Sequence, residues 1–229
     1  MALVVAAAGY EWARLCLLAG ARAWIYATLV ALALIGALAA GEAVQRAIWM
    51  LGAVFWIVLV PVWLARGVQA SPRAALVAAG FVVLVPAGLA MVSLPALAVL
   101  GVLVLVWVAD SGAYFVGRAW GRHKLAPAIS PGKTWEGAAG GIIGALAYAI
   151  ICGEFLGPLA WAPFLGAAAL TAALSIVGDL FESAAKRQAS VKDSGALLPG
   201  HGGILDRIDS ATATLPLAAL LVPLMKGNW

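Results

Sequence analysis

Eight long apolar segments dominate this 229-residue sequence and restrict it to a membrane fold. Only 10% of the residues are charged, whereas soluble domains average about 25%. The segments approach the roughly 20 residues that a helix needs to cross a bilayer, and they lack the period-two alternation of barrel strands. The sequence therefore predicts an all-α, polytopic integral membrane protein with about eight transmembrane helices, within a range of about seven to nine. The segments are 2–18, 23–40, 47–65, 73–92, 95–115, 137–155, 163–181 and 210–225.

One membrane domain is expected over residues 1–229, because no linker, repeat or low-complexity tail divides the chain. Within it, residues 1–92 carry little chemistry, and residues 95–229 form the expected catalytic half. The first segment is the weakest, because Glu11 and Arg14 interrupt it. It is interpreted either as a short span or as the end of a longer helix.

Positive charge alternates across the connections between segments. Arginine and lysine are concentrated after the first, third, fifth and seventh segments, whereas the intervening connections carry only Arg46. By the positive-inside rule, the long polar loops 116–136 and 182–209 face the cytoplasm. We therefore expect a polar active-site cavity that opens on the cytoplasmic side, and the C-terminus on the other side.

Other features exclude several classes. No basic stripe crosses a polar domain, so nucleic acid is not an expected partner. Cys16 and Cys152 lie in apolar surroundings and are interpreted as small buried residues. The N-terminus lacks the basic region that begins a cleaved signal peptide.

The segment 183–209 concentrates ionisable residues, and such a cluster in an apolar membrane chain indicates a functional site. Asp206 and Asp209 are three residues apart, which places both on one face of a helix. Paired carboxylates suit Mg²⁺, which often binds through one or two carboxylates plus substrate phosphates. Asp179 is the expected third ligand. The alternative is that Arg207 neutralises its acidic neighbours.

Several cations in the same segment suit phosphate groups. Lys186, Arg187 and Lys192 are candidates, although they also fit a surface that meets anionic lipid. Glu182 and Lys186 have the spacing of a helical salt bridge, which favours a structural role for Glu182. The turn 200–203, which contains His201, presents backbone N–H groups that suit an anion, or is a plain turn.

The second polar loop contains Lys133 between Gly132 and Thr134. This is not a P-loop, because the position of its first glycine is occupied by Pro127 and no strand is predicted before it. A lysine beside hydroxyl groups still suits phosphate. Asp110 ends a long apolar segment, and we expect it to bind metal or water or to pair with Lys133.

These motifs resemble the phosphatidate cytidylyltransferases, also called CDP-diacylglycerol synthases. The upstream sequences DSGAYFVGR, from Asp110, and SPGKTWEG, from Ser130, are similar to family motifs. In the N-terminal half, only the segment from Glu11 to Arg14 is similar. The longest match consists of Ser183, Lys186-Arg187, Lys192-Asp193, Gly195, Leu198-Pro199, His201-Gly202-Gly203, Asp206-Arg207 and Asp209.

The resemblance implies a bacterial inner-membrane enzyme that converts CTP and phosphatidic acid into CDP-diacylglycerol and pyrophosphate with one or two Mg²⁺ ions, as a monomer or a homodimer. The expected metal ligands are Asp110, Asp179, Asp206 and Asp209. The expected catalytic residues are Asp179, Asp206, Asp209, Lys133, Lys186 and Arg187. The residues expected to bind the nucleotide are Ser130, Lys133, Thr134, Lys186, Arg187, Lys192, His201, Gly202, Gly203 and Arg207.

Two alternatives remain open from the sequence. One is a related CTP-dependent transferase that acts on another lipid phosphate or on a lipid alcohol. The other is an ion transporter lined by the carboxylates, although a transporter is expected to place such groups near the membrane midplane. Metal-dependent release of pyrophosphate from CTP distinguishes a transferase from a passive transporter.

Overall fold

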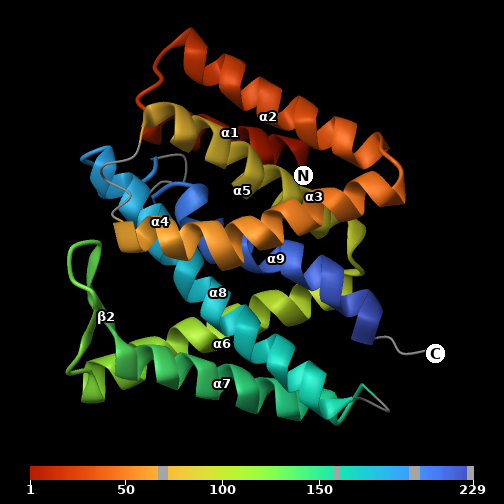
Figure 1. The fold of residues 1–229 in the computed structure, drawn as a ribbon, viewed down its shortest axis with the longest axis vertical. Helices are drawn as coiled ribbons and strands as arrows, with labels where there is room; N and C mark the ends of the chain where they lie inside the picture. Colours follow the sequence, from red (N-terminus) through yellow and green to blue (C-terminus); the bar gives the residue numbers. More distant parts are fainter. Residues whose placement is uncertain (67–71, 157–159, 196–201, 226–229) are drawn as a thin grey trace.

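The computed structural model describes the chain except for residues 67–71, 157–159, 196–201 and 226–229 (Figure 1). Long helices make up nearly all of the described chain, and one short hairpin interrupts them. The elements are α1 (Ala2–Leu15), α2 (Ala21–Ala39), α3 (Glu42–Val54), the π-helical turn η1 (Phe55–Leu59), α4 (Val60–Arg66), α5 (Arg73–Ser93), α6 (Ala96–Trp120), β1 (Lys124–Ala126), β2 (Ser130–Thr134), α7 (Trp135–Gly153), α8 (Trp161–Gln188) and α9 (Leu205–Met225).

Each of the eight apolar segments corresponds to one helix, with α3, η1 and α4 forming the continuous third one. Among the described residues, six helices are long and apolar enough to cross a membrane. They are Ala21–Ala39, Glu42–Arg66, Arg73–Ser93, Ala96–Trp120, Trp135–Gly153 and Trp161–Gln188. The prediction of an all-α membrane protein is confirmed at this level. The first segment yields a helix of only 14 residues, as its interruption by charge suggested.

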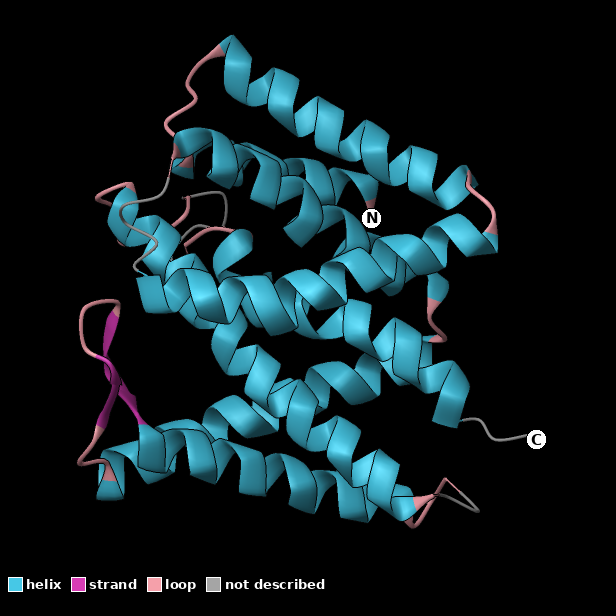
Figure 2. Cartoon of the chain, viewed as in Figure 1, coloured by secondary structure: helices cyan, strands magenta, loops and turns pink. Residues whose placement is uncertain are grey.

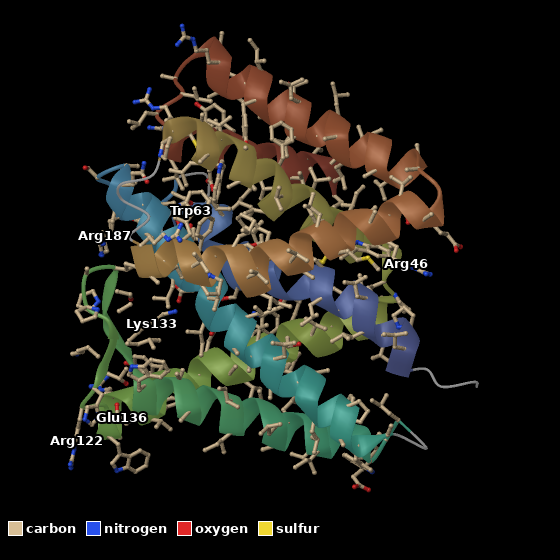
Figure 3. All side chains as sticks on the ribbon, in the orientation of Figure 1. Arg46, Trp63, Arg122, Lys133, Glu136 and Arg187 are labelled. Atoms are coloured by element: carbon tan, nitrogen blue, oxygen red, sulfur yellow. The ribbon has the colours of Figure 1, made fainter. Side chains whose placement is uncertain are left out.

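The connections separate toward two ends of the bundle (Figure 2). In this view the α1–α2 connection, the hairpin and the C-terminal end of α8 lie at the left end. The α2–α3 and α5–α6 connections lie at the right end, where Figure 3 also places Arg46. The α1–α2 connection, the hairpin and the basic end of α8, which are cation-rich in the sequence, therefore share one end of the molecule.

Glycines allow α6 and α7 to pack closely, as their spacing predicted. A Cβ atom at Gly141 would lie 2.7 Å from the carbonyl oxygen of Ala109, and one at Gly137 would lie 2.8 Å from that of Ala113. The backbones can approach this closely only because both positions lack side chains. The helices α6 and α7 are connected by the hairpin, which lies at their cation-rich end.

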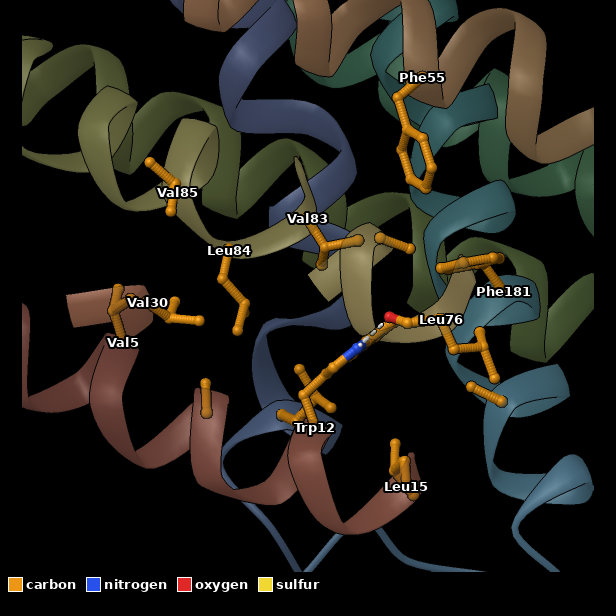
Figure 4. Packing of buried hydrophobic residues seen from close by; sticks show 14 of the residues in the cluster. Val5, Trp12, Leu15, Val30, Phe55, Leu76, Val83, Leu84, Val85 and Phe181 are labelled. Atoms are coloured by element: carbon orange, nitrogen blue, oxygen red, sulfur yellow. Dashed lines mark hydrogen bonds between the residues drawn. The ribbon is translucent and has the colours of Figure 1, made fainter. Parts of the chain in front are cut away.

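An aromatic core joins the first helices to α8. Phe181 stacks on Trp12 with ring centroids 5.9 Å apart, and it meets Phe55 and Trp56 edge to face. The indole N–H of Trp12 donates to the backbone oxygen of Leu76 at 2.8 Å, as the dashed line in Figure 4 marks. Because Phe181 lies two residues after Asp179, this core holds the part of α8 that carries candidate site residues.

Candidate active site

The C-terminal end of α8 and the N-terminal end of α9 meet at Lys186. Its ammonium group lies 2.8 Å from Glu182 Oε2 and 2.7 Å from Asp206 Oδ1. The three side chains are largely buried, with 15%, 3% and 12% of their surfaces exposed. The predicted helical pair of Glu182 and Lys186 is confirmed, and Asp206 joins it from the start of α9. Two buried carboxyl groups therefore share one lysine as their partner.

Asp206 is held from both sides. Its Oδ2 accepts hydrogen bonds from the backbone N–H groups of Ser194, at 3.0 Å, and Gly203, at 2.9 Å, and from the Ser194 hydroxyl at 2.9 Å. Partial burial disfavours its charge, but the hydrogen bond from Lys186 and those from the backbone outweigh this effect and lower the pKa of Asp206 to about 2. Asp206 is therefore ionised, and its hydrogen bonds connect Ser194 and Gly203 to the start of α9.

A second group of charges centres on Lys133 of the hairpin. Its ammonium group lies 2.6 Å from Asp179 Oδ2, and Figure 3 shows Lys133 on the hairpin beside the bundle. Asp110 lies within electrostatic range of both residues. The sequence suggested Asp110 as the partner of Lys133, whereas the ion pair joins Lys133 to Asp179.

Asp209 belongs to this second group. Its Oδ1 accepts the N–H of Ser210 at 2.7 Å, and it interacts electrostatically with Asp179, Lys186 and Lys133. Burial, with the nearby charge of Asp179 adding to it, raises the pKa of Asp209 to about 6. The pKa values of Asp206 and Asp209 are therefore shifted in opposite directions, although the two residues are only three positions apart.

The hairpin is fixed to the helices at several points. Thr134 caps α7 by accepting the N–H of Gly137 at 3.1 Å, which gives this predicted phosphate ligand a structural contact. Arg187 Nε donates to the backbone oxygen of Ile129 at 3.4 Å. Ser130 begins β2, with its Cα opposite that of Ala126. The loop resembling SPGKTWEG is thus a strand that leads directly into a helix, a feature the sequence analysis did not predict.

The remaining predicted nucleotide ligands occupy different positions. Lys192 and Arg207 are exposed. Gly202 has a φ of +83°, a conformation that favours glycine, and its neighbour Gly203 donates to Asp206. His201 lies outside the described residues, so its contribution to nucleotide binding stays a prediction.

Sequence reasoning missed the part played by Glu11. This residue of α1 is almost fully buried, with 1% of its surface exposed, and it contacts Ser194 and the start of α9. The available signal was an acidic residue within an apolar segment, which is costly unless it has partners. From the sequence, Glu11 is interpreted as an interruption of the first span and as part of a segment similar to the family, without a contact or role assigned to it.

The carboxylates suit a hard divalent cation in their donor chemistry. Within the described ranges, no three histidine, cysteine or carboxylate side chains are grouped closely enough to hold a metal ion. Asp179 and Asp209 nevertheless interact as like charges, which a bound cation would neutralise. Two carboxylates completed by substrate phosphates and water are a usual Mg²⁺ arrangement.

Comparison with known proteins agrees with the motifs. The chain is similar to phosphatidate cytidylyltransferases of Haemophilus influenzae (54% identical over 120 residues, 50% of this chain and 42% of the relative) and Pseudomonas aeruginosa (48% over 150 residues, 62% and 55%). A third such relative, from Bacillus subtilis, is 50% identical over 124 residues, covering 53% of this chain and 45% of the relative. The chain spans about half the length of the curated relatives it matches. The profile of the Cytidylyltransferase family matches residues 1–225, and this chain therefore belongs to that family.

Proposed function

We propose that this protein transfers a cytidylyl group from CTP to phosphatidic acid, producing CDP-diacylglycerol and pyrophosphate. The observation that carries the proposal is the gathering of Lys133, Asp179, Lys186, Asp206 and Asp209 at the ends of α8, α9 and the hairpin. Relatives named phosphatidate cytidylyltransferase support this choice of substrates.

In this reaction a phosphate oxygen of phosphatidic acid forms a bond to the α-phosphorus of CTP. The bond between that phosphorus and the oxygen bridging to the β-phosphate breaks, and pyrophosphate leaves with the electron pair. Such a reaction requires positioning and neutralisation of charge more than covalent catalysis by the protein.

The described residues suit these two tasks. Lys133 lies on a short hairpin beside α8, where it can hold a phosphate in place of its ion pair with Asp179. Asp179 and Asp209, with Asp110 nearby, would hold Mg²⁺, which supplies neutralisation of the triphosphate charge when bound. Lys186 keeps Asp206 and the start of α9 in position.

The same proposal includes the orientation in the membrane. We propose that all eight helical segments cross or enter the bilayer of the bacterial inner membrane, with the hairpin end in the cytoplasm. The cation-rich connections at that end support this orientation by the positive-inside rule. CTP would then reach a polar cavity from the cytoplasm, while the acyl chains of the lipid remain in the bilayer.

The test supplies purified protein in detergent with phosphatidic acid and one of CTP, ATP, GTP or UTP, with and without Mg²⁺. Lipid product and pyrophosphate are both measured. We expect CDP-diacylglycerol only with CTP or dCTP and metal. Folded protein that forms product only with another lipid phosphate or a lipid alcohol would replace the proposed acceptor, and folded protein that releases no pyrophosphate with any acceptor would contradict the proposal.

A further inference from the structure

Glu11 links the first helix of the chain to the start of the last one. Its Oε1 accepts the backbone N–H of Ile204 at 3.1 Å, and its Oε2 accepts that of Leu205 at 2.8 Å. The Ser194 hydroxyl lies 3.2 Å from Oε2. These partners compensate the burial of the acidic group, and the N-terminal end of a helix favours negative charge. The contact joins residues that are more than 180 positions apart in the sequence.

Two glycines leave room for this contact. A Cβ atom at Gly203 would lie 2.6 Å from Glu11 Oε2, and one at Gly195 would collide with Oε1. Backbone conformation does not require glycine at either position, because the glycines with a positive φ among the described residues are Gly20 and Gly202. The polar segment is therefore shaped around the Glu11 side chain.

Ser194 connects Glu11 to the acidic site. Its hydroxyl lies between Glu11 Oε2, at 3.2 Å, and Asp206 Oδ2, at 2.9 Å. The hydroxyl has one proton to donate, so the two acceptors share it. The backbone N–H of the same serine also donates to Asp206. A displacement of the Glu11 side chain would therefore also displace Asp206, both through Ser194 and through the first turn of α9.

We propose that Glu11 is a positioning residue for the acidic site: it fixes the start of α9 and, through Ser194, the carboxylates of Asp206 and Asp209. The proposal rests on the cytidylyl transfer proposed above. Glu11 does not touch the reacting atoms. Its effect is expected in the turnover number, because a displacement of about 1 Å in a catalytic group can reduce a rate about a hundredfold.

The test compares Glu11→Gln, Ser194→Ala and Tyr26→Phe. Glutamine keeps the size of the side chain but replaces one acceptor oxygen with an NH₂ group that cannot accept the N–H donors. Tyr26→Phe is the matched control, because it keeps the aromatic ring and removes a long-range hydrogen bond between α2 and α5, directed to the backbone oxygen of Val77. For each variant, kcat and KM for CTP are measured at a temperature where circular dichroism shows it to be folded. Hydrogen exchange of the amides in 202–209 is measured alongside.

We expect Glu11→Gln to lower kcat about ten- to a hundredfold with KM for CTP changed less than threefold. Exchange in 202–209 should accelerate at least tenfold, whereas Tyr26→Phe should leave both quantities within twofold of wild type. Ser194→Ala should lower kcat less than Glu11→Gln, and the double variant should lose less than the product of the two single losses.

A folded Glu11→Gln protein with wild-type kcat and exchange would overturn the proposal, as would equal losses in Glu11→Gln and Tyr26→Phe. If Glu11→Gln does not fold, Ser194→Ala decides: unchanged kcat and exchange overturn the proposal. If the wild type itself does not transfer cytidylyl groups, the proposed function fails on its own. The exchange of 202–209 then decides whether Glu11 fixes α9.

Discussion

Replacement of Lys186 by methionine should show how much more the buried ion pairs of Lys186 contribute to stability than the more exposed pair of Lys133 and Asp179. Methionine has a similar length but no charge, so the variant leaves Glu182 and Asp206 without the cation that lies 2.8 and 2.7 Å from them. Removal of one partner from a buried ion pair costs about 3–5 kcal/mol, because the remaining charge stays buried without compensation. Here two carboxylates lose their shared partner, so we expect a loss in that range.

Lys133→Met is the matched comparison. Lys133 also forms a short ion pair, but its side chain is 24% exposed and that of Asp179 is 35% exposed. Pairs that water can reach contribute only about 0–1 kcal/mol. Both variants should lose cytidylyl transfer, because both cations belong to the proposed site. Only Lys186→Met should also lose much stability.

Thermal unfolding in one detergent, followed by circular dichroism, measures the difference. For a chain of this length 1 kcal/mol changes the Tm by about 2–4 °C. Lys186→Met should therefore unfold roughly 6–20 °C below wild type, and Lys133→Met at most about 4 °C below it. Adding Glu182→Gln to Lys186→Met removes one uncompensated charge and should restore part of the loss.

Two results would refute this reasoning. A wild-type Tm for Lys186→Met would mean that water or another group already compensates the carboxylates of Glu182 and Asp206. Equal losses for the two lysine variants would mean that burial does not distinguish the two ion pairs.

Three further substitutions test the packing and the second charge group. Gly80→Ala should lower the free energy of unfolding by at least about 2 kcal/mol in a denaturation assay, because the new methyl group would collide with the hydroxyl of Tyr26 and the indole of Trp12 and displace their hydrogen bonds. Gly141→Ala should also destabilise the protein, because α6 and α7 would have to separate, whereas Gly144→Ala in the same helix meets only ordinary contacts at 3.5 Å and should leave the Tm unchanged or raised. Asp209→Asn should reduce turnover at least about a hundredfold, equivalent to about 2.7 kcal/mol, with little change in Tm, and near-normal activity would contradict its assignment as a metal ligand.

The helices and several local contacts were predictable from the sequence. An apolar segment of nearly 20 residues has few alternatives to a helix in a bilayer, because every backbone polar group must find a partner within the segment. The Glu182–Lys186 pair follows from four-residue spacing, and the close approach of α6 and α7 follows from glycines at intervals of three and four.

Contacts between distant parts of the chain were not predictable in the same way. The hairpin lacks the alternating apolar pattern of a strand, since it includes Pro131, Gly132 and two lysines. The partner of Lys133 depends on how this hairpin lies against α8. In the structure Lys133 forms its ion pair with Asp179, although Asp110 also has a suitable charge. The contact of Glu11 depends on the packing of α1 against the start of α9.

The pair Asp206 and Asp209 shows why spacing alone does not assign a role. Three-residue spacing predicted one shared face and one shared metal, but Asp206 already receives Lys186 on one oxygen and three hydrogen bonds on the other. Asp209 accepts the adjacent Ser210 N–H on Oδ1, and its charge acts against that of Asp179. Asp179 is also paired with a lysine, but Lys133 and Asp179 are more exposed than Lys186 and Asp206, so a hydrated cation can replace Lys133 more readily. A cation at Asp179 and Asp209 would also relieve the repulsion between these two carboxylates. We therefore expect Asp209 and Asp179 to be the better candidates for the metal, with Asp206 as the residue through which Lys186 and Glu11 would hold that pair in place.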